Sequence, residues 1–250
     1  MLSNKEIICP INLLDVAHKK KDIPAGIVNA GKMLPMLSVI DAVKENLINP
    51  ILIGDKDEIQ KCAEELQFDI SKYEIIHEPK ENSTAKIAAK LASQGKIKII
   101  VKGHIHTDVL MKEVIKKEYN LLGKTRLSHI WHMTLEKNDK PIIITDGALN
   151  VSPNVKTKIH ILKNVINFCH RIGIEKPKVS VLSATEEVLD SVQSSIDAKE
   201  ITELAKKENL KADVFGPLAF DNSVSKKSSG IKGIKNSVAG QADVLLVPNV

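Results

Sequence analysis

Aromatic side chains are scarce in this chain, where they make up 3% of 250 residues. Its core must therefore be built from Ile, Leu, Val and Ala. Such a core is typical of helices packed on parallel sheets, and less so of β-sandwiches with large ring anchors. The 43% of hydrophobic and 27% of charged residues are ordinary for a globular protein. The composition therefore excludes a disordered chain and favours the α/β class.

Cysteine is also rare, because the chain has only Cys9, Cys62 and Cys169. An odd number of widely spaced cysteines predicts neither a disulfide framework nor a cysteine-based zinc site. The N-terminus lacks a basic region followed by a long apolar run, and no later segment reaches the length of a membrane span. We therefore expect a cytoplasmic protein with no membrane partner.

Basic blocks are missing as well, since the net charge of +5 comes from lysines spread along the chain. Nucleic acid is therefore not an expected partner. The only arginines are Arg126 and Arg171. No Walker A run, GxGxxG, GxSxG or HExxH motif occurs. Their absence argues against P-loop hydrolysis, simple Rossmann dehydrogenation, α/β-hydrolase chemistry and zincin proteolysis.

Short apolar runs alternate with helical periods from end to end, which predicts a β/α rhythm. Asp197 and Glu200 have the spacing of a capping box and predict a helix start there. No helix follows the last predicted strand to cover the sheet. Strands are predicted at 25–30, 51–54, 73–77, 98–101, 127–135, 141–145, 177–183, 212–216 and 242–248, and helices after Pro35, at 55–66, 83–93, from 107 or 108, from 155 to about 173, and at 197–210.

The stretch KGHIHTDVLM, residues 102–111, joins a predicted strand to a predicted helix. Its two histidines, His104 and His106, have a spacing that could serve a metal. Zinc needs a third or fourth ligand, however, and catalytic zinc also needs an open position. The remaining candidates, His129 and His132, lie three apart on a predicted strand, where side chains face opposite sides. We therefore expect no metal site.

An anion suits the same turn better on physical grounds. Gly103 allows the backbone to approach a ligand closely, and the unpaired N–H groups at the helix start attract negative charge. Lys102 and His106 add side-chain donors. Thr107 is either a ligand contact or only the cap of the helix, and Asp108 can be explained by the helix dipole alone.

Polar turns also follow other predicted strands. Turn chemistry and helix capping explain each of them separately. Because the carboxyl ends of parallel strands line the side where α/β sheets bind ligands, the turns together predict a ligand cleft. The residues in these turns are Asn150 in ITDGALNVSPN, Ser183 in VLSATEE, and Asp221 and Asn222 in GPLAFDNSVS.

Eight segments carry a resemblance: PILIGD (50–55), KGHIHTDVLMKEVI (102–115), RLSHIWHM (126–133), ITDGALNVSPN, VLSATEEV, GPLAFDNSVS, KGI (232–234) and VAGQADVLLVPN (238–249). Together they resemble the phosphate acetyl/butyryltransferase family. The nearest branch is the phosphate butyryltransferase-like one, which includes the acyltransferase part of bifunctional enoyl-CoA hydratase/phosphate acetyltransferases. The match runs in order from about Ile23 to the last residue.

The resemblance implies two α/β/α domains similar to those of isocitrate and isopropylmalate dehydrogenases, with the active site between them. We place these domains at residues 1–133 and 134–250. The implied reaction is reversible transfer of an acetyl or butyryl group between CoA and inorganic phosphate. It uses no metal, nicotinamide or covalent acyl-enzyme. CoA or acyl-CoA and phosphate or acyl phosphate are then the partners, and a homodimer is compatible with the family.

Substrate contacts follow from the same resemblance. In such a mechanism the protein positions both substrates, a carboxylate helps to take the thiol proton, and donors stabilise the carbonyl oxyanion. We expect Arg126 to contact phosphate or CoA rather than to be a surface charge, and Arg171 to be a helix C-terminal charge. The family's loop beside the phosphate and acyl site matches Lys102, Gly103, His106 and Thr107, and its next cleft segment matches Arg126, Ser128 and His129.

The chain departs from the family pattern at its end. Family members continue beyond the VPN segment to a Ser-Arg pair and an Asp, to which catalysis is chiefly attributed, and none of these three lies within the 250 residues. We therefore expect a C-terminally truncated, impaired phosphate acyltransferase. The alternative is a noncatalytic remnant with at most weak CoA or phosphate binding. A metal-dependent hydroxyacid dehydrogenase on the related fold is disfavoured, because the ligand carboxylates are missing.

Overall fold

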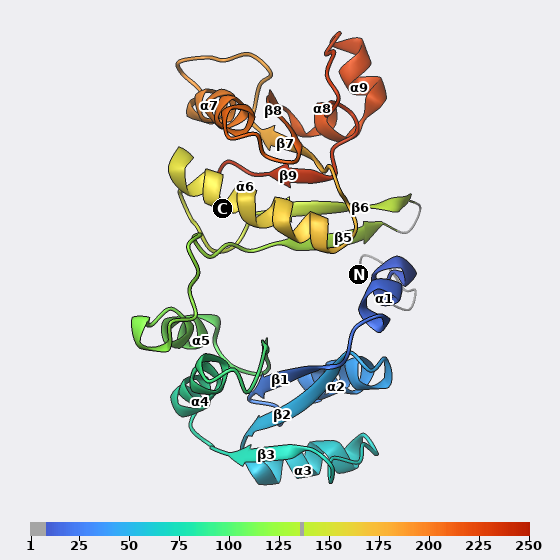
Figure 1. Cartoon of the computed structure of the whole chain (residues 1–250), viewed down its shortest axis with the longest axis vertical. Helices are drawn as coiled ribbons and strands as arrows, with labels where there is room; N and C mark the ends of the chain where they lie inside the picture. Colours follow the sequence, from blue (N-terminus) through green and yellow to red (C-terminus); the bar gives the residue numbers. More distant parts are fainter. Residues whose placement is uncertain (1–8, 136–137) are drawn as a thin grey trace. The chain divides into compact units, whose positions relative to one another are not determined.

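The chain forms two compact units, Met1–Gly123 and Lys124–Val250. The computed structural model describes residues 9–135 and 138–250. Figure 1 shows a sheet with helices in each unit. The elements of the first unit are α1 (Ile11–His18), β1 (Ile23–Val28), α2 (Met33–Lys44), β2 (Ile48–Gly54), α3 (Lys56–Glu65), β3 (Glu74–His77), α4 (Glu81–Ser93), β4 (Ile99–Lys102), α5 (Thr107–Val114) and a 3-10 turn (Lys117–Tyr119).

The sheet of the first unit is entirely parallel and has the order β3-β2-β1-β4. Side chains of β1 alternate between its two faces. Ala25 and Ile27 pack with α2 and α3, whereas Val28 packs with α4 and α5. Because both faces are covered, the strands need apolar residues on both sides, which explains the continuous apolar runs in the sequence.

The second unit contains a mixed five-stranded sheet of order β5-β6-β9-β7-β8. Strand β5 is antiparallel to β6, and the other pairs are parallel. Helices α6 and α7 pack on one face of this sheet. Its elements are β5 (Trp131–Leu135), β6 (Asn138–Thr145), α6 (Val155–Arg171), β7 (Lys178–Leu182), α7 (Gln193–Lys207), β8 (Asp213–Leu218), α8 (Phe220–Val224), α9 (Lys226–Ile231) and β9 (Val244–Leu246).

The last strand, β9, lies in the middle of the second sheet, between β6 and β7 (Figure 1). Val244 and Leu246 pack against α6 and α7, and Leu245 packs against Leu218 and residues 238–242 on the opposite face. Elements from earlier in the chain bury β9 on both sides.

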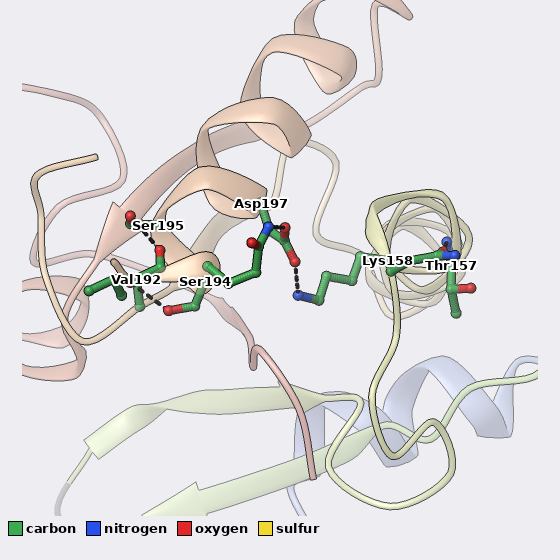
Figure 2. A network of polar contacts seen from close by, with 9 residues as sticks. Thr157, Lys158, Val192, Ser194, Ser195 and Asp197 are labelled. Atoms are coloured by element: carbon green, nitrogen blue, oxygen red, sulfur yellow. Dashed lines mark hydrogen bonds and ion pairs between the residues drawn. The ribbon is translucent and has the colours of Figure 1, made fainter. Parts of the chain in front are cut away.

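Two expectations differ from the structure. The unit boundary lies at 123/124, not at 133/134, because β5 pairs with β6 through Trp131 and Ile144. The predicted capping box is wrong because α7 begins at Gln193 and already runs through Asp197. The Asp197 carboxylate instead accepts from Lys158 Nζ at 2.7 Å, which ties α7 to α6 (Figure 2).

The helices of the described part of the chain are too short or too polar for a bilayer, and none of them could cross one.

Candidate functional site

A switch point lies at the carboxyl end of the first sheet. Strand β1 continues into α2 on one face, whereas its neighbour β4 continues into α5 on the other. Open α/β sheets bind ligands in the crevice at such a point. A hollow of about 490 Å³, here called the switch-point hollow, opens there and is lined by Asn29, Glu81, Lys102, Gly103, His104, Ile105, His106 and Thr107.

Gly103 joins the two strand ends that form the hollow. Its N–H donates to Val28 O at 2.9 Å, and the N–H of His104 donates to Asn29 O at 3.1 Å. A Cβ at position 103 would lie 2.3 Å from Val28 O and 2.7 Å from Asn29 O. Only glycine fits this approach of two backbones.

His106 is held in place by a carboxylate from another helix. One oxygen of Glu81, the first residue of α4, accepts from the His106 backbone N–H at 2.6 Å and contacts Nδ1 of its ring at 2.7 Å. These hydrogen bonds, the backbone one foremost, lower the pKa of Glu81. Glu81 is therefore ionised at neutral pH and supplies a negative charge beside the start of α5.

The remaining loop residues are open to solvent. Lys102 ends β4 and Thr107 begins α5, and both side chains are exposed at the rim of the hollow. The structure thus brings the four residues predicted for this loop, Lys102, Gly103, His106 and Thr107, around one hollow. Their role as ligand contacts stays a prediction.

A smaller hollow of about 260 Å³ adjoins the first one, with Asn29 and His104 common to both. Its charged groups include Lys32 and Glu58, which form an ion pair of 3.1 Å. The carboxyl edge of the first sheet therefore presents groups of both signs to solvent.

In the second unit, Arg126, Ser128 and Asn150 lie close together. Asn164 of α6 donates to Arg126 O at 2.7 Å and to Ser128 Oγ at 2.9 Å. Asn150 donates to the carbonyl of Leu127 at 3.0 Å and to the buried carboxylate of Asp146 at 2.5 Å.

Within this cluster only the Arg126 side chain is exposed, with a long 3.4 Å contact from Nη1 to Thr157 Oγ1. The amide of Asn150 and the hydroxyl of Ser128 are engaged inside the protein. Arg126 is therefore the member of the group whose charge is presented to solvent.

A second polar cluster follows strands β7 and β8. Asn222 is fully buried, and its Nδ2 donates to the Glu186 carboxylate, which also accepts from Lys232 Nζ at 3.0 Å with each oxygen. Burial raises the pKa of Glu186, but the bonds from Lys232 and Asn222 outweigh it, and the net shift is downward. Ser183 is buried and bonded to Ser194 at 2.9 Å, whereas Asp221 is exposed.

The structure places His129 apart from these contacts. Its ring packs on Trp131 with centroids 4.6 Å apart, and its carbonyl accepts from Thr145 Oγ1 at 2.7 Å. His132 of β5 packs edge-on against Phe168. Within residues 9–135 and 138–250, no group of three or more His, Cys, Asp or Glu side chains is arranged to hold a metal ion.

The residues of these clusters that were not identified from the sequence include Asn29, Glu81, Glu186 and Lys232. Asn29 had a usable signal, because it is a polar residue at the end of a predicted strand, like the residues that were singled out. Glu81 and Glu186 had none. Their partners His106 and Lys232 lie 25 and 46 positions away, and only the fold brings them into contact.

Known proteins similar to this chain agree on one family. The family model described as "Phosphate acetyl/butaryl transferase" matches residues 80–250. A phosphate acetyltransferase of Rickettsia prowazekii is 37% identical over 242 residues, which cover 96% of this chain and 69% of the relative. A phosphate butyryltransferase of Clostridium acetobutylicum is 34% identical over 246 residues, which cover 98% of this chain and 82% of the relative.

A solved structure agrees with this result. The crystal structure of a branched-chain phosphotransacylase from Enterococcus faecalis V583 aligns with a TM-score of 0.78 and 30% identity, over 91% of this chain and 79% of that one. The chain therefore has an α/β fold with mainly parallel sheets, like that of a phosphotransacylase. It belongs to the phosphate acetyl/butyryltransferase family.

Proposed function

We propose that this chain transfers an acetyl or butyryl group reversibly between CoA and inorganic phosphate. The observation that carries the proposal is the family match over residues 80–250, supported by relatives of both names that align with nearly the whole chain. The switch-point hollow supports the same conclusion. It combines a close backbone turn, a lysine and a helix start, which together suit an anion.

The reaction needs positioning and charge more than it needs a reactive protein group. A phosphate oxygen attacks the thioester carbonyl carbon, a C–O bond forms, the C–S bond breaks, and the CoA sulfur takes up a proton. We assign phosphate to the switch-point hollow, where Lys102 supplies charge, Thr107 a hydroxyl and helix N–H groups, and Gly103 the close backbone. Donors aimed at the carbonyl oxygen stabilise its developing negative charge.

The second unit contributes further proposed substrate contacts. Arg126 is the strongest of them, because its guanidinium is exposed and suits the phosphate groups of CoA or the inorganic ion. Ser128 and Asn150 lie in its neighbourhood. His129 is retained from the family resemblance, although its ring packs on Trp131. The proposal also retains Ser183, Asp221 and Asn222 after strands β7 and β8, although Ser183 and Asn222 are buried.

The proposal also covers the type of fold, the cellular location, the oligomeric state and the cofactors. We assign the dehydrogenase-like two-domain type, a cytoplasmic location, homodimerisation, and a reaction without metal or nicotinamide. CoA and phosphate are then substrates and not resident cofactors.

A coupled assay tests the function directly. The purified chain is supplied with phosphate and either acetyl-CoA or butyryl-CoA, and released thiol is followed. We expect phosphate-dependent CoA release from at least one donor. The variant Arg126→Gln should raise the KM of a substrate about tenfold or more, consistent with loss of a charged hydrogen bond. Arg171→Gln, the matched control on α6, should not change it.

The noncatalytic alternative makes a different prediction. It expects no thiol release with either donor, while calorimetry still detects weak binding of CoA or phosphate. Absence of both turnover and binding would remove both versions of the proposal.

A further inference from the structure

We propose that Glu81 selects the anion that enters the switch-point hollow, because its carboxylate accepts a hydrogen bond that phosphate can donate and sulfate cannot. Glu81 is then a specificity-determining residue for oxyanions that carry a hydrogen. The inference rests on the proposed function and deepens it. Glu81 lies 25 residues before His106 in the sequence, and only the fold brings its carboxylate to the hollow.

The first step of the argument is that the protein fixes one oxygen of Glu81. Oε1 lies 2.6 Å from the backbone nitrogen of His106 and 2.7 Å from Nδ1 of its ring. Glu81 is the first residue of α4, and His106 is the N-cap of α5. The carboxylate therefore joins the starts of two helices, and these contacts hold it at the wall of the hollow.

The second step concerns the other oxygen, Oε2. Within residues 9–135 and 138–250, both contacts of the Glu81 carboxylate are made by Oε1, and Oε2 accepts a hydrogen bond from no residue. The side chain is 34% exposed and lines the hollow. Oε2 is therefore available as an acceptor to a molecule that enters.

The third step is the charge of the carboxylate. Hydrogen bonds from His106, that of the backbone N–H foremost, lower the pKa of Glu81. An ionised carboxylate accepts hydrogen bonds and has none to donate. An anion beside Oε2 must therefore bring a hydrogen of its own. Otherwise two negative charges face each other with no bond between them.

The other groups of the hollow do not distinguish phosphate from sulfate. Lys102 supplies positive charge, Thr107 a hydroxyl, and Gly103 the close backbone, and all three suit either tetrahedral anion. Among the described residues that line the hollow, Glu81 is the only carboxylate. Discrimination between the two anions therefore falls to Glu81.

The two anions differ in the hydrogens that they carry. Near neutral pH, inorganic phosphate keeps one or two hydrogens, whereas sulfate has lost both. A P–OH group that donates to Oε2 of Glu81 leaves the unprotonated oxygens of phosphate for Lys102 and for the attack on the thioester carbonyl carbon. The same contact thus selects phosphate and orients it.

The kinetic test compares the two anions in the coupled assay. The KM for phosphate is measured together with the inhibition constant of sulfate as a competitor. In the native chain sulfate should bind about tenfold or more weakly than phosphate, because it cannot bond to the charged carboxylate.

Glu81→Gln keeps an amide oxygen for His106 and gains N–H groups that can donate to sulfate. The ratio of the sulfate inhibition constant to the phosphate KM should therefore fall about tenfold or more. Glu81→Ala removes the repulsion but supplies no donor, and it should lower this ratio by a smaller factor. A Glu81→Gln variant with a native ratio would show that Glu81 only supports the turn, and it would overturn the inference while the acyltransferase function stands.

Asp108→Asn is the matched control for charge. Asp108 is exposed in the first turn of α5 and does not line the hollow. Its loss removes a negative charge beside the same helix start, which should change the affinity for both anions alike and leave the ratio native. If Asp108→Asn lowered the ratio as much as Glu81→Gln, the general charge of the turn would set the preference, and the contact with Glu81 would be rejected.

Calorimetric titration with inorganic phosphate and with sulfate repeats the comparison without turnover. The ratio of the two dissociation constants should change in Glu81→Gln as the kinetic ratio does. If the chain releases no CoA, the proposed function fails, and the dissociation constants alone decide the inference. A native chain that binds sulfate as tightly as phosphate, or that binds neither anion, overturns it.

Discussion

The two units end their parallel strands in different ways. In the first unit, Lys102 and His106 stand exposed around a hollow, and the close backbone contact of Gly103 holds the turn. In the second unit, the polar residues after the strands bond mainly to one another, as Asn222 does with Glu186.

This difference separates two uses of polar residues. An exposed charge beside a hollow contributes little to the stability of the fold and is available to a ligand. A buried amide or carboxylate with fixed partners stabilises the fold, and its loss leaves an unsatisfied group in the interior. Substitutions in the second unit should therefore affect stability first, and those at the rim of the first hollow should affect activity first.

The chain itself provides separate signals for the two units. Its one tryptophan, Trp131, lies in β5 of the second unit, and its two tyrosines, Tyr73 and Tyr119, lie in the first. Tryptophan fluorescence and the tyrosine near-UV signal can therefore follow the unfolding of each unit in urea.

The largest effect is expected from Asp197→Ala in the second unit. Lys158 is 4% exposed and would keep a buried charge without its carboxylate, so the free energy of unfolding should fall by about 3–5 kcal/mol. Urea denaturation followed by tryptophan fluorescence measures this loss.

The exposed Asp190→Ala is the control and should change stability by less than about 0.5 kcal/mol. Replacing both partners, Lys158→Met with Asp197→Leu, should restore most of the loss. A loss below about 1 kcal/mol in Asp197→Ala would contradict a structural role.

The next largest effect is expected from Gly103→Ala in the first unit. The added Cβ meets backbone oxygens at 2.3 and 2.7 Å, and the strand ends must separate to admit it. The free energy of unfolding from the tyrosine signal should fall by about 1–3 kcal/mol. Gly123→Ala is the control, because nothing lies within 4 Å of its added Cβ. Equal stabilities of the two variants would show that the close approach is not required.

A slightly smaller loss in the free energy of unfolding than that of Gly103→Ala is expected from Asn222→Ala in the second unit. The variant removes the amide that bonds to Glu186, and its tryptophan-detected unfolding free energy should decrease by about 1–2 kcal/mol. Asp221→Asn, at the exposed neighbour, should leave stability unchanged. If Asp221→Asn lowered the free energy of unfolding more than Asn222→Ala, this turn would not divide into a buried residue that stabilises the fold and an exposed one that does not.

Acid should weaken the second unit through its carboxylates. Asp197 has a lowered pKa because bonds from Lys158 and Gln193 outweigh its burial, and Glu186 behaves similarly. A carboxyl whose pKa is lower in the folded than in the unfolded state stabilises the fold above its ordinary pKa, 3.8 for Asp197. This stabilisation is lost as pH falls through the folded value.

The free energy of unfolding should therefore fall between pH 6 and pH 3, as these carboxyls take up protons. Urea unfolding at several pH values, followed through Trp131, measures it. Glu186→Gln should flatten the pH dependence, and an unchanged slope in that variant would show that Glu186 does not contribute.

The smallest change in stability is expected from Lys102→Gln. The side chain is exposed, so unfolding free energy should stay within about 0.5 kcal/mol of the native value. The KM for phosphate should nevertheless rise about tenfold, consistent with loss of a charged contact. Lys98→Gln, just before the other end of β4, is the matched control for both measurements. A native KM in Lys102→Gln would remove this lysine from the proposed phosphate site.

Local patterns predicted the individual elements well. The apolar run KIIV and Gly103 predicted a strand that turns into a helix at Thr107 or Asp108, and the structure confirms this with a helix that begins at Thr107. A helix was likewise predicted at 55–66, and α3 begins at Lys56, with the Asp55 side chain accepting from the backbone N–H groups of Asp57 and Glu58. These signals are reliable because the groups that interact to produce them lie within a few residues of one another in the sequence.

Contacts across the fold could not be predicted in the same way. Asp197 and Glu200 have a good capping pattern, but Asp197 pairs with Lys158, and the helix begins before it. The buried state of Asn222 was also missed, because an Asn after a strand reads as an exposed turn residue until its neighbours are known.

Composition and short-range spacing were enough to predict an α/β protein with most of its strands and longer helices, and the resemblance of its segments indicated the family. These properties depend on backbone preferences and on which residues alternate along a few turns of chain. Packing alone decided that the final strand lies between β6 and β7, and that Glu81 reaches His106. Both outcomes depend on burying apolar faces that are distant in sequence, and no local interaction encodes that geometry.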